Sequence, residues 1–227
     1  MQGLQLEPRH DLRRTRSRNR RRAGFTLIEI MAVVLIIGIL MAFLLPKIPE
    51  MIDQAEVTAC RANQTEIYKG LMLYKTKFGR LPARENSGVR FFAILVDSGT
   101  WEDTETSSKK LTCPGVDQSY LTVSDLPIAE WYSDLELLDG GSSTYAGRDT
   151  VNFPLRGLKS GKDVLLADDN DGDMNHRTTT NVLYGDGVSR GMELADLRDQ
   201  GIIDEEDDLL IVGPDSPVEA LQVLSLD

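Results

Sequence analysis

An apolar run of 21 residues, at positions 25–45, constrains this chain more than any other feature of its sequence. The run, FTLIEIMAVVLIIGILMAFLL, contains one charged residue, Glu29, and one glycine, Gly38. As an α-helix rising ~1.5 Å per residue it would be roughly 31 Å long, which matches the hydrocarbon core of a bilayer. The sequence therefore predicts a membrane-spanning helix at residues 25–45.

The charges on the two sides of this span differ in sign. Residues 1–24 hold eight arginines against two acidic residues, whereas the rest of the chain holds 17 basic and 34 acidic residues. Arginines beside a span orient that end toward the cytoplasm, so we expect the remainder on the far side of the membrane. An acidic exported portion lacks the clustered Lys and Arg that phosphates require, which argues against nucleic acid as a partner.

The start of the span carries a specific motif. The string GFTLIE at residues 24–29, followed by the unbroken apolar run and by Pro46, resembles the processing site of type IV pilins and of type II secretion pseudopilins. The resemblance implies that residues 1–24 are a leader peptide, which a prepilin peptidase removes after Gly24 before it methylates the new amino terminus on Phe25. A plain signal anchor that carries the motif by accident is the alternative.

Glu29 requires a reason, because a carboxylate inside a span costs up to ~3 kcal/mol and is usually functional. The family resemblance assigns Phe25, Glu29 and Pro46 to assembly, with Glu29 meeting the Phe25 amine of a neighbouring subunit. At about 4 Å and an effective dielectric near 20, such a pair gains ~4 kcal/mol before desolvation is counted. It would also set the axial register between subunits.

Residues 46–79 continue with helical spacing in spite of Pro46 and Pro49. Apolar residues recur every three to five positions and predict an amphipathic helix that ends at Gly79. We therefore expect one long helix, with a transmembrane half at residues 25–45 and an outer half packed on a globular domain. The predicted apolar stripe consists of Ile48, Ile52, Ala55, Ala59, Ala62, Ile67, Leu71, Tyr74 and Phe78.

Residues 80–200 are expected to form a small periplasmic domain with an antiparallel β-sheet, so that the fold class is α+β and pilin-like. Strand patterns at 179–184 and 188–193 flank Gly185-Asp186-Gly187, which indicates a hairpin. Asp186 is either a turn residue or a catalytic or ligand carboxylate, and an aspartate between two turn glycines is usually structural. A buried strand is predicted at 163–167, while strand order in 103–163 stays open.

Residues 201–227 are predicted to be an acidic tail with a short terminal helix. The run DEEDD at 204–208 is typical of a solvated surface. Ser216, Pro217 and Glu219 then have the spacing of a capped helix start.

A second stretch, at residues 74–102, resembles the segment after the long helix in the major pseudopilins of type II secretion. The resemblance implies a short helix at residues 88–96. Both resemblances together imply a structural subunit, not an enzyme, that assembles from the inner membrane into a pilus-like filament and drives protein export. The implied location is a single pass through the inner membrane, with a cytoplasmic N-terminus, followed by a periplasmic or cell-surface filament. The implied partners are the membrane before assembly, other copies of the chain, prepilin peptidase, an inner-membrane assembly platform and minor pilins.

Two alternatives to the secretion pseudopilus remain. One is a subunit of a type IV pilus that serves adhesion, motility or DNA uptake. The other is a membrane-anchored periplasmic binding domain or enzyme. Against an enzyme, GxSxG, HExxH and glycine-rich phosphate-loop motifs are absent, and His176 is the one histidine outside the leader.

The segment ADDNDGDMNH at 167–176 is the candidate for a metal site. Several carboxylates around a glycine suit a hard cation, since Ca2+ takes six to eight oxygen ligands. The segment does not fit the EF-hand pattern, because no glutamate closes it. The pseudopilin resemblance implies a calcium in a loop of the globular domain, and an acidic surface turn is the alternative. The candidate ligands are Asp168, Asp169, Asp171 and Asp173.

The chain has two cysteines, Cys60 and Cys113, and both follow the span. In an oxidising compartment they can form a disulfide, whose loop of about 54 residues would contribute roughly 4 kcal/mol in the chain-entropy model. Cys60 also lies on the predicted apolar stripe, so a buried free thiol is the alternative. No CxxC pair is present, and two isolated cysteines do not predict a zinc site.

Overall fold

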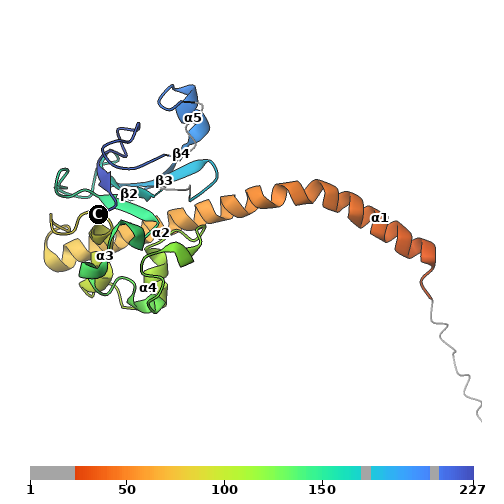
Figure 1. Ribbon diagram of the computed structural model, residues 1–227, viewed down its shortest axis with the longest axis horizontal. Helices are drawn as coiled ribbons and strands as arrows, with labels where there is room; N and C mark the ends of the chain where they lie inside the picture. Colours follow the sequence, from red (N-terminus) through yellow and green to blue (C-terminus); the bar gives the residue numbers. More distant parts are fainter. Residues whose placement is uncertain (1–23, 170–174, 205–209) are drawn as a thin grey trace, which may run out of the picture. The chain divides into compact units, whose positions relative to one another are not determined.

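The structure is a computed structural model that describes residues 24–169, 175–204 and 210–227 (Figure 1). The chain divides into two compact units, Met1–Lys47 and Ile48–Asp227. The fold is α+β: helical structure extends from Leu27 to Phe78, and a five-stranded antiparallel sheet follows it along the chain.

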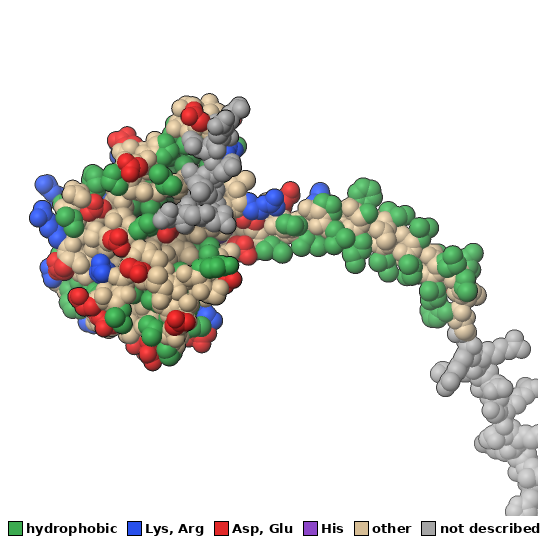
Figure 2. Space-filling view, viewed as in Figure 1, with side chains coloured by type: hydrophobic (Ala, Val, Ile, Leu, Met, Phe, Trp, Pro, Cys, Tyr) green, Lys and Arg blue, Asp and Glu red, His purple; other side chains and the backbone are tan. Residues whose placement is uncertain are grey.

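The first unit contains the predicted apolar helix. Helix α1 (Leu27–Leu44) has no buried residue, and a short 3-10 turn, η1 (Leu45–Lys47), follows it at Pro46. The turn falls there because proline has no N–H to continue the helical hydrogen bonds. Hydrophobic side chains cover α1 along its length (Figure 2). By length and composition the helix can cross a membrane.

The second unit begins with helix α2 (Ile48–Phe78), and its buried face differs from the predicted stripe. Ile67, Leu71 and Tyr74 are buried as predicted, but the face continues toward the N-terminus through Cys60 and Gln64. The earlier positions of the predicted stripe, Ile48 through Ala62, are exposed. The prediction was wrong there because it counted alanines as core and passed over a polar residue whose amide is hydrogen-bonded inside the protein.

The sheet has the strand order β4-β3-β2-β1-β5, and every neighbouring pair is antiparallel. Its strands are β1 (Tyr145–Arg148), β2 (Val164–Asp168), β3 (Thr179–Tyr184), β4 (Ser189–Glu193) and β5 (Leu224–Ser225). The predicted hairpin is therefore present as β3 and β4, and Gly187 adopts a positive φ of 84° in its turn. The predicted strand at 163–167 is present as β2.

Two hydrophobic cores lie on the two faces of the sheet. Neighbouring residues alternate between them: Tyr145 and Leu183 belong to the core shared with α2, whereas Ala146 and Val182 belong to the opposite core. The register shifts between Val164 and Leu166, and such a bulge changes which residues of a strand face which side. After the bulge, Leu166 and then Asp168 point to the α2 side.

Short helices complete both layers. Helix α3 (Arg90–Asp97) confirms the predicted helix at 88–96 and buries Phe91, Phe92 and Leu95. Helix α4 (Glu105–Lys110) and four 3-10 turns connect it to β1, in the segment whose order the sequence left open. Figure 1 shows α2, α3 and α4 on one side of the sheet and α5 (Leu194–Asp199) on the other.

The C-terminal segment corrects two predictions. Residues 216–223 form consecutive turns, not a terminal helix, although the Ser216 hydroxyl does accept from the Val218 N–H at 3.2 Å. The helix cannot extend because Leu224 and Ser225 pair with Arg148 and Gly147 as strand β5. The segment is also not a separate tail, since Leu210, Leu221 and Leu224 are buried in the second core. Residues 205–209 of the acidic run lie outside the described residues.

Candidate functional site

The N-terminus of α1 is held by a reciprocal capping box between Thr26 and Glu29. The Glu29 backbone N–H donates to Thr26 Oγ1 at 3.3 Å, and Glu29 Oε2 accepts from the Thr26 N–H at 2.7 Å and hydroxyl at 2.8 Å. Two otherwise unsatisfied donors at the helix start are thereby paired. The spacing Thr-x-x-Glu is sufficient to predict this box, although a role was expected for Glu29 alone and not for Thr26.

The residues on either side of the predicted cleavage site are accessible. Phe25 is 83% exposed, and among the described residues no atom other than those of the neighbours of Gly24 lies within 4 Å of the place where a Cβ on Gly24 would sit. A peptidase would therefore meet an extended, uncovered segment directly before the capped helix. The leader residues 1–23 lie outside the described residues.

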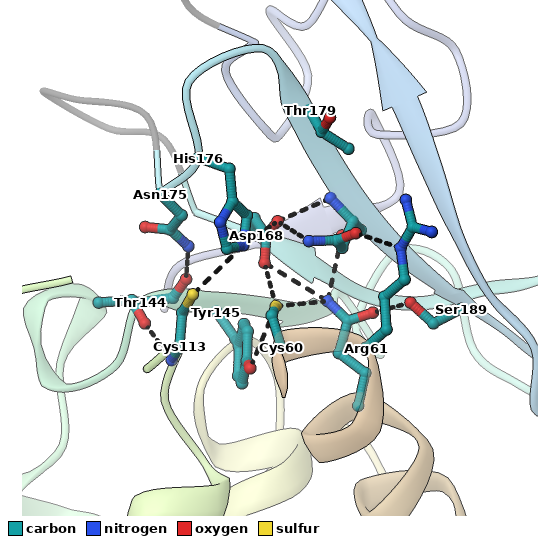
Figure 3. A network of polar contacts seen from close by, with 12 residues as sticks. Cys60, Arg61, Cys113, Thr144, Tyr145, Asp168, Asn175, His176, Thr179 and Ser189 are labelled. Carbon is teal, nitrogen blue, oxygen red and sulfur yellow. Dashed lines mark hydrogen bonds and ion pairs between the residues drawn. The ribbon is translucent and has the colours of Figure 1, made fainter. Parts of the chain in front are cut away.

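A second group of polar residues lies inside the globular unit. Cys60, Cys113, Asp168 and His176 are buried, and one ligand-type atom from each lies within 4.8 Å of all the others (Figure 3). Cys60, Cys113 and Asp168 are each separated by more than 50 residues along the chain, whereas Asp168 and His176 are close in sequence. We call these four residues the interior cluster.

Each member is positioned by a different element. Cys60 lies on the buried face of α2, and Asp168 is the last residue of β2, on the sheet face that packs against α2. Cys113 lies in the turn Thr-Cys-Pro-Gly at residues 112–115, where its backbone N–H donates to Thr144 Oγ1 at 2.6 Å. His176 precedes β3, beside Asn175, whose side-chain amide donates to the Thr144 carbonyl at 2.7 Å. Thr144 therefore anchors both the Cys113 turn and the segment that carries His176.

The contacts within the interior cluster are close. Cys60 Sγ donates to Asp168 Oδ1 at 3.0 Å, and Cys113 Sγ lies 3.4 Å from His176 Nε2. His176 Nε2 lies 3.6 Å from Asp168 Oδ2. One nitrogen of the ring therefore faces both a sulfur and a carboxylate oxygen.

The titration behaviour of the interior cluster is shifted by its burial and by its own contacts. Contact with the Cys60 thiol, and then with the His176 imidazole, lowers the pKa of Cys113 to about 7. Burial raises the pKa of the Cys60 thiol well above its ordinary value and also raises the pKa of Asp168. Burial alone would lower the pKa of His176, but its contact with Cys113 and the charge of Asp168 raise it.

A shell of amide donors surrounds the interior cluster. The Asp168 carboxylate accepts from the Asn181 backbone N–H at 2.6 Å and from its side-chain amide at 2.9 Å. Arg61 Nε donates to Asn181 Oδ1 at 2.7 Å, while Gln64 bridges the Asn181 carbonyl, at 3.1 Å, and the Ser189 hydroxyl, at 2.6 Å. These bonds tie α2 to β3 and β4 and hold the carboxylate in place.

This set of residues has three chemical possibilities: metal coordination, disulfide formation, and activation of Cys113 as a nucleophile. A nucleophile must reach a substrate, but Cys60 and Cys113 are fully buried and His176 is 2% exposed. The arrangement is therefore poorly suited to catalysis on an external substrate. Both cysteines are free thiols in the structure, so the disulfide stays a prediction for which the sulfurs are already close together.

The predicted calcium ligands are divided between two environments. Asp168 belongs to the interior cluster, and its carboxylate is engaged by Cys60 and Asn181. Asp169 follows it at the end of the described segment, while Asp171 and Asp173 lie outside the described residues. The calcium site therefore stays a prediction. Asp186, the other candidate carboxylate, pairs with Arg190 at 2.5 Å across the hairpin turn.

Comparison with known protein families shows similarity at the N-terminus of the chain. The prokaryotic N-terminal methylation motif matches residues 19–45, which include the cleavage segment, the capping box and α1. With the apolar helix and the small antiparallel sheet domain described above, this match supports a type IV pilin-like protein.

One known protein is similar to part of this chain. Over 56 residues the chain is 46% identical to the type II secretion system core protein G of Pseudomonas aeruginosa. The match covers 25% of this chain and 39% of that protein, so it spans about two fifths of the relative's length. No solved structure matches the chain significantly.

Proposed function

We propose that this chain is a structural subunit of a pilus-like filament, cleaved after Gly24 by a prepilin peptidase and assembled from the inner membrane to drive type II secretion. The observation that carries the proposal is the capped apolar helix α1, which has no buried residue and lies within the match to the methylation motif. The 18 residues of α1 are largely apolar and none is buried, so the helix requires an apolar environment outside its own chain. A bilayer supplies it before assembly, and the helices of other subunits supply it afterwards.

Glu29 has a specific part in this proposal. In the uncleaved chain its carboxylate accepts from the Thr26 N–H and hydroxyl, so its charge is partly compensated while the helix is stored in the membrane. Cleavage after Gly24 creates an amine on Phe25, directly before the cap. A carboxylate that already points to the helix start is then available to the amine of a neighbouring subunit, which attracts it by charge.

The globular unit would form the surface of the filament. The interior cluster is buried and does not suit catalysis on an external substrate. The role proposed for the chain is a structural one, as a filament subunit.

Processing is tested by expressing the full-length chain with and without a prepilin peptidase and measuring the intact mass and N-terminal residue of the product. We expect a mature chain that begins with methylated Phe25 when the peptidase is present, and the precursor when it is absent. A chain that keeps residues 1–24 under both conditions would contradict the proposal. Gly24→Ala is the matched block of cleavage, and Gly38→Ala, inside α1, is the control.

The choice between a secretion pseudopilus and a type IV pilus rests on the 56-residue likeness to the core protein G. The source organism without this chain should fail to export a secreted enzyme while its surface pili and twitching motility stay normal. Loss of pili with normal export would favour the second candidate, a type IV pilus subunit.

A further inference from the structure

We propose that Cys60, Cys113, Asp168 and His176 form a tetrahedral binding site for a zinc ion in the interior of the globular unit. The site would be structural, because all four residues are buried and no coordination position faces solvent. It would join α2, the Cys113 turn, the end of β2 and the segment before β3.

The geometry fits tetrahedral coordination. With Zn–S near 2.3 Å and Zn–N or Zn–O near 2.1 Å, neighbouring ligand atoms in a tetrahedron lie roughly 3.4 to 3.8 Å apart. The measured separations are 3.0 Å from Cys60 Sγ to Asp168 Oδ1, 3.4 Å from Cys113 Sγ to His176 Nε2, and 3.6 Å from His176 Nε2 to Asp168 Oδ2. These three separations lie within about 0.6 Å of the tetrahedral values, with Asp168 offering Oδ1 toward Cys60 or Oδ2 toward His176. All four ligand-type atoms lie within 4.8 Å of one another, so closing onto a metal requires shifts of up to about 1 Å.

The types of ligand select the metal. Two thiolates, one imidazole and one carboxylate suit zinc, whereas magnesium and calcium prefer sites made of oxygen atoms alone. Binding requires that both thiols lose their protons, which pass to solvent as the metal enters. Two thiolates and a carboxylate around Zn2+ leave one negative charge, and the amides of Asn181 and Gln64 donate hydrogen bonds toward it.

The second coordination sphere is also in place. Among the described residues, His176 Nδ1 is buried and has no hydrogen-bond partner, but it lies 3.9 Å from Asp53 Oδ1. Metal on Nε2 leaves a proton on Nδ1, which faces this carboxylate in the arrangement that commonly orients zinc-bound histidines. Asp53 is itself fixed, because Oδ1 accepts from the Arg177 N–H at 3.0 Å. Tyr145 Oη lies 3.4 Å from Cys60 Sγ and can donate to the bound thiolate.

A bound metal would also account for polar side chains on the buried face of α2. Cys60 and Gln64 occupy core positions on α2 where the helix pattern favours apolar side chains. A carboxylate buried beside two thiols and an imidazole is costly unless each group has a partner. A bound cation supplies one partner for all four groups.

The first test measures zinc in the full-length chain, purified in detergent under reducing conditions and dialysed against metal-free buffer. We expect about one zinc per chain by elemental mass spectrometry. Cys113→Ser and His176→Gln should each lose it, and Asp125→Asn, at an exposed carboxylate, should retain it. Asp53→Asn should keep the zinc but weaken its affinity by about 10- to 100-fold, as changes next to a ligand do.

The second test does not depend on whether the ligand variants fold. Metal-stripped wild-type chain is titrated with Co2+, which reports coordination through its visible spectrum. Intense absorption typical of tetrahedral geometry, together with a thiolate-to-cobalt charge-transfer band, would support the proposal, and zinc should abolish both. Fluorescence of Trp101 and Trp131, the two tryptophans of the chain, verifies that the globular unit is folded.

Three results would overturn the proposal. One is a folded wild-type chain without zinc whose two thiols react freely after unfolding. A second is a mass lower by two hydrogens, because it would show that Cys60 and Cys113 form a disulfide. The third is a folded Cys113→Ser variant that binds zinc as tightly as the wild type.

Discussion

Asp168 and Asn181 lie on neighbouring strands, and one oxygen of the Asp168 carboxylate accepts both the backbone and the side-chain N–H groups of Asn181, at 2.6 and 2.9 Å. Both residues are completely buried. The opposite side of the Asn181 amide accepts from Arg61 on α2. One asparagine thus connects a buried carboxylate to helix α2, and its loss should remove hydrogen bonds from both Asp168 and Arg61.

Replacement of Asn181 by leucine should destabilise the globular unit by about 2 to 3 kcal/mol, because it leaves Asp168 short of a donor and Arg61 without its acceptor. Urea unfolding of the full-length chain in detergent, followed by tryptophan fluorescence, measures this change. Asn63→Leu is the control, since the Asn63 amide makes one long contact of 3.4 Å, to the Thr112 carbonyl. Equal losses in the two variants would contradict the role given to Asn181.

Two substitutions at Glu29 separate its two contributions. Glu29→Gln keeps a side chain that completes a capping box but removes the charge, whereas Glu29→Leu removes both. We expect both variants to insert into the membrane and both to fail in filament assembly, since assembly depends on the charge. Assembly is measured by electron microscopy and by the amount of filament protein that shearing releases from cells. Glu50→Gln, a substitution at an exposed glutamate on α2, is the control. Normal filaments from Glu29→Gln would show that capping, and not charge, is what Glu29 provides.

Gly147 on β1 tolerates no side chain. A Cβ there would overlap the Gly88 carbonyl oxygen and lie 3.3 Å from the Phe91 Cβ, so α3 would have to move away from the sheet. Gly147→Ala should therefore lower the free energy of unfolding by about 2 to 3 kcal/mol. Gly157→Ala is the matched control, because nothing lies within 4 Å of its added Cβ, and it should be neutral or stabilising by up to about 1 kcal/mol. A neutral Gly147→Ala would refute the close approach of β1 and α3.

Asp149 makes stability depend on pH in the acidic range. Burial alone would raise the pKa of its carboxyl, but donors from Asn152 and the Val151 N–H lower it below the usual value. The folded protein thus binds this proton less readily than the unfolded chain does. The stabilisation is complete above the unfolded pKa of about 3.9 and is lost as the pH falls through the lower, folded value.

Asp149→Ala should accordingly cost about 1 to 3 kcal/mol at pH 7, because it leaves backbone donors without their acceptor. The difference from the wild type should shrink as the pH falls below about 4. Thermal melting across this range measures it, and Asp125→Ala, at an exposed carboxylate, should show no such trend. A difference that stays constant down to the lowest pH would mean that the effect is not caused by the charge.

The fold was largely predictable where a simple periodicity decides structure. Helix α1 and the β3–β4 hairpin follow from apolar length and from two glycines in a turn, whereas α3 was expected from the family resemblance of residues 74–102. The C-terminal turns were not predictable from local sequence, because a capped start at Ser216 competes with the pairing of β5 to β1, which is a long-range contact. Tertiary pairing overrode a local preference there.

The interior cluster was predictable only in part. Cys60, Cys113, Asp168 and His176 each stand out singly in the sequence, but their spacing contains no recognisable metal motif, and the acidic pattern at 167–176 predicts a calcium loop that includes Asp168. What unites them is the packing of α2 on β2 and the position of the bulge between Val164 and Leu166, which turns Asp168 inward. Thr26 is the opposite case, because its spacing from Glu29 was sufficient to predict the capping box.

The two outer strands of the sheet have a consequence for copies of this protein held close together. Strand β5 is only two residues long, and β4, the other edge, carries the charged residues Arg190 and Glu193. Short and charged edges pair poorly with strands of another molecule. Where many copies are crowded, strand pairing between the sheet edges of different molecules would compete with ordered packing. The short and charged edges of this sheet disfavour such pairing.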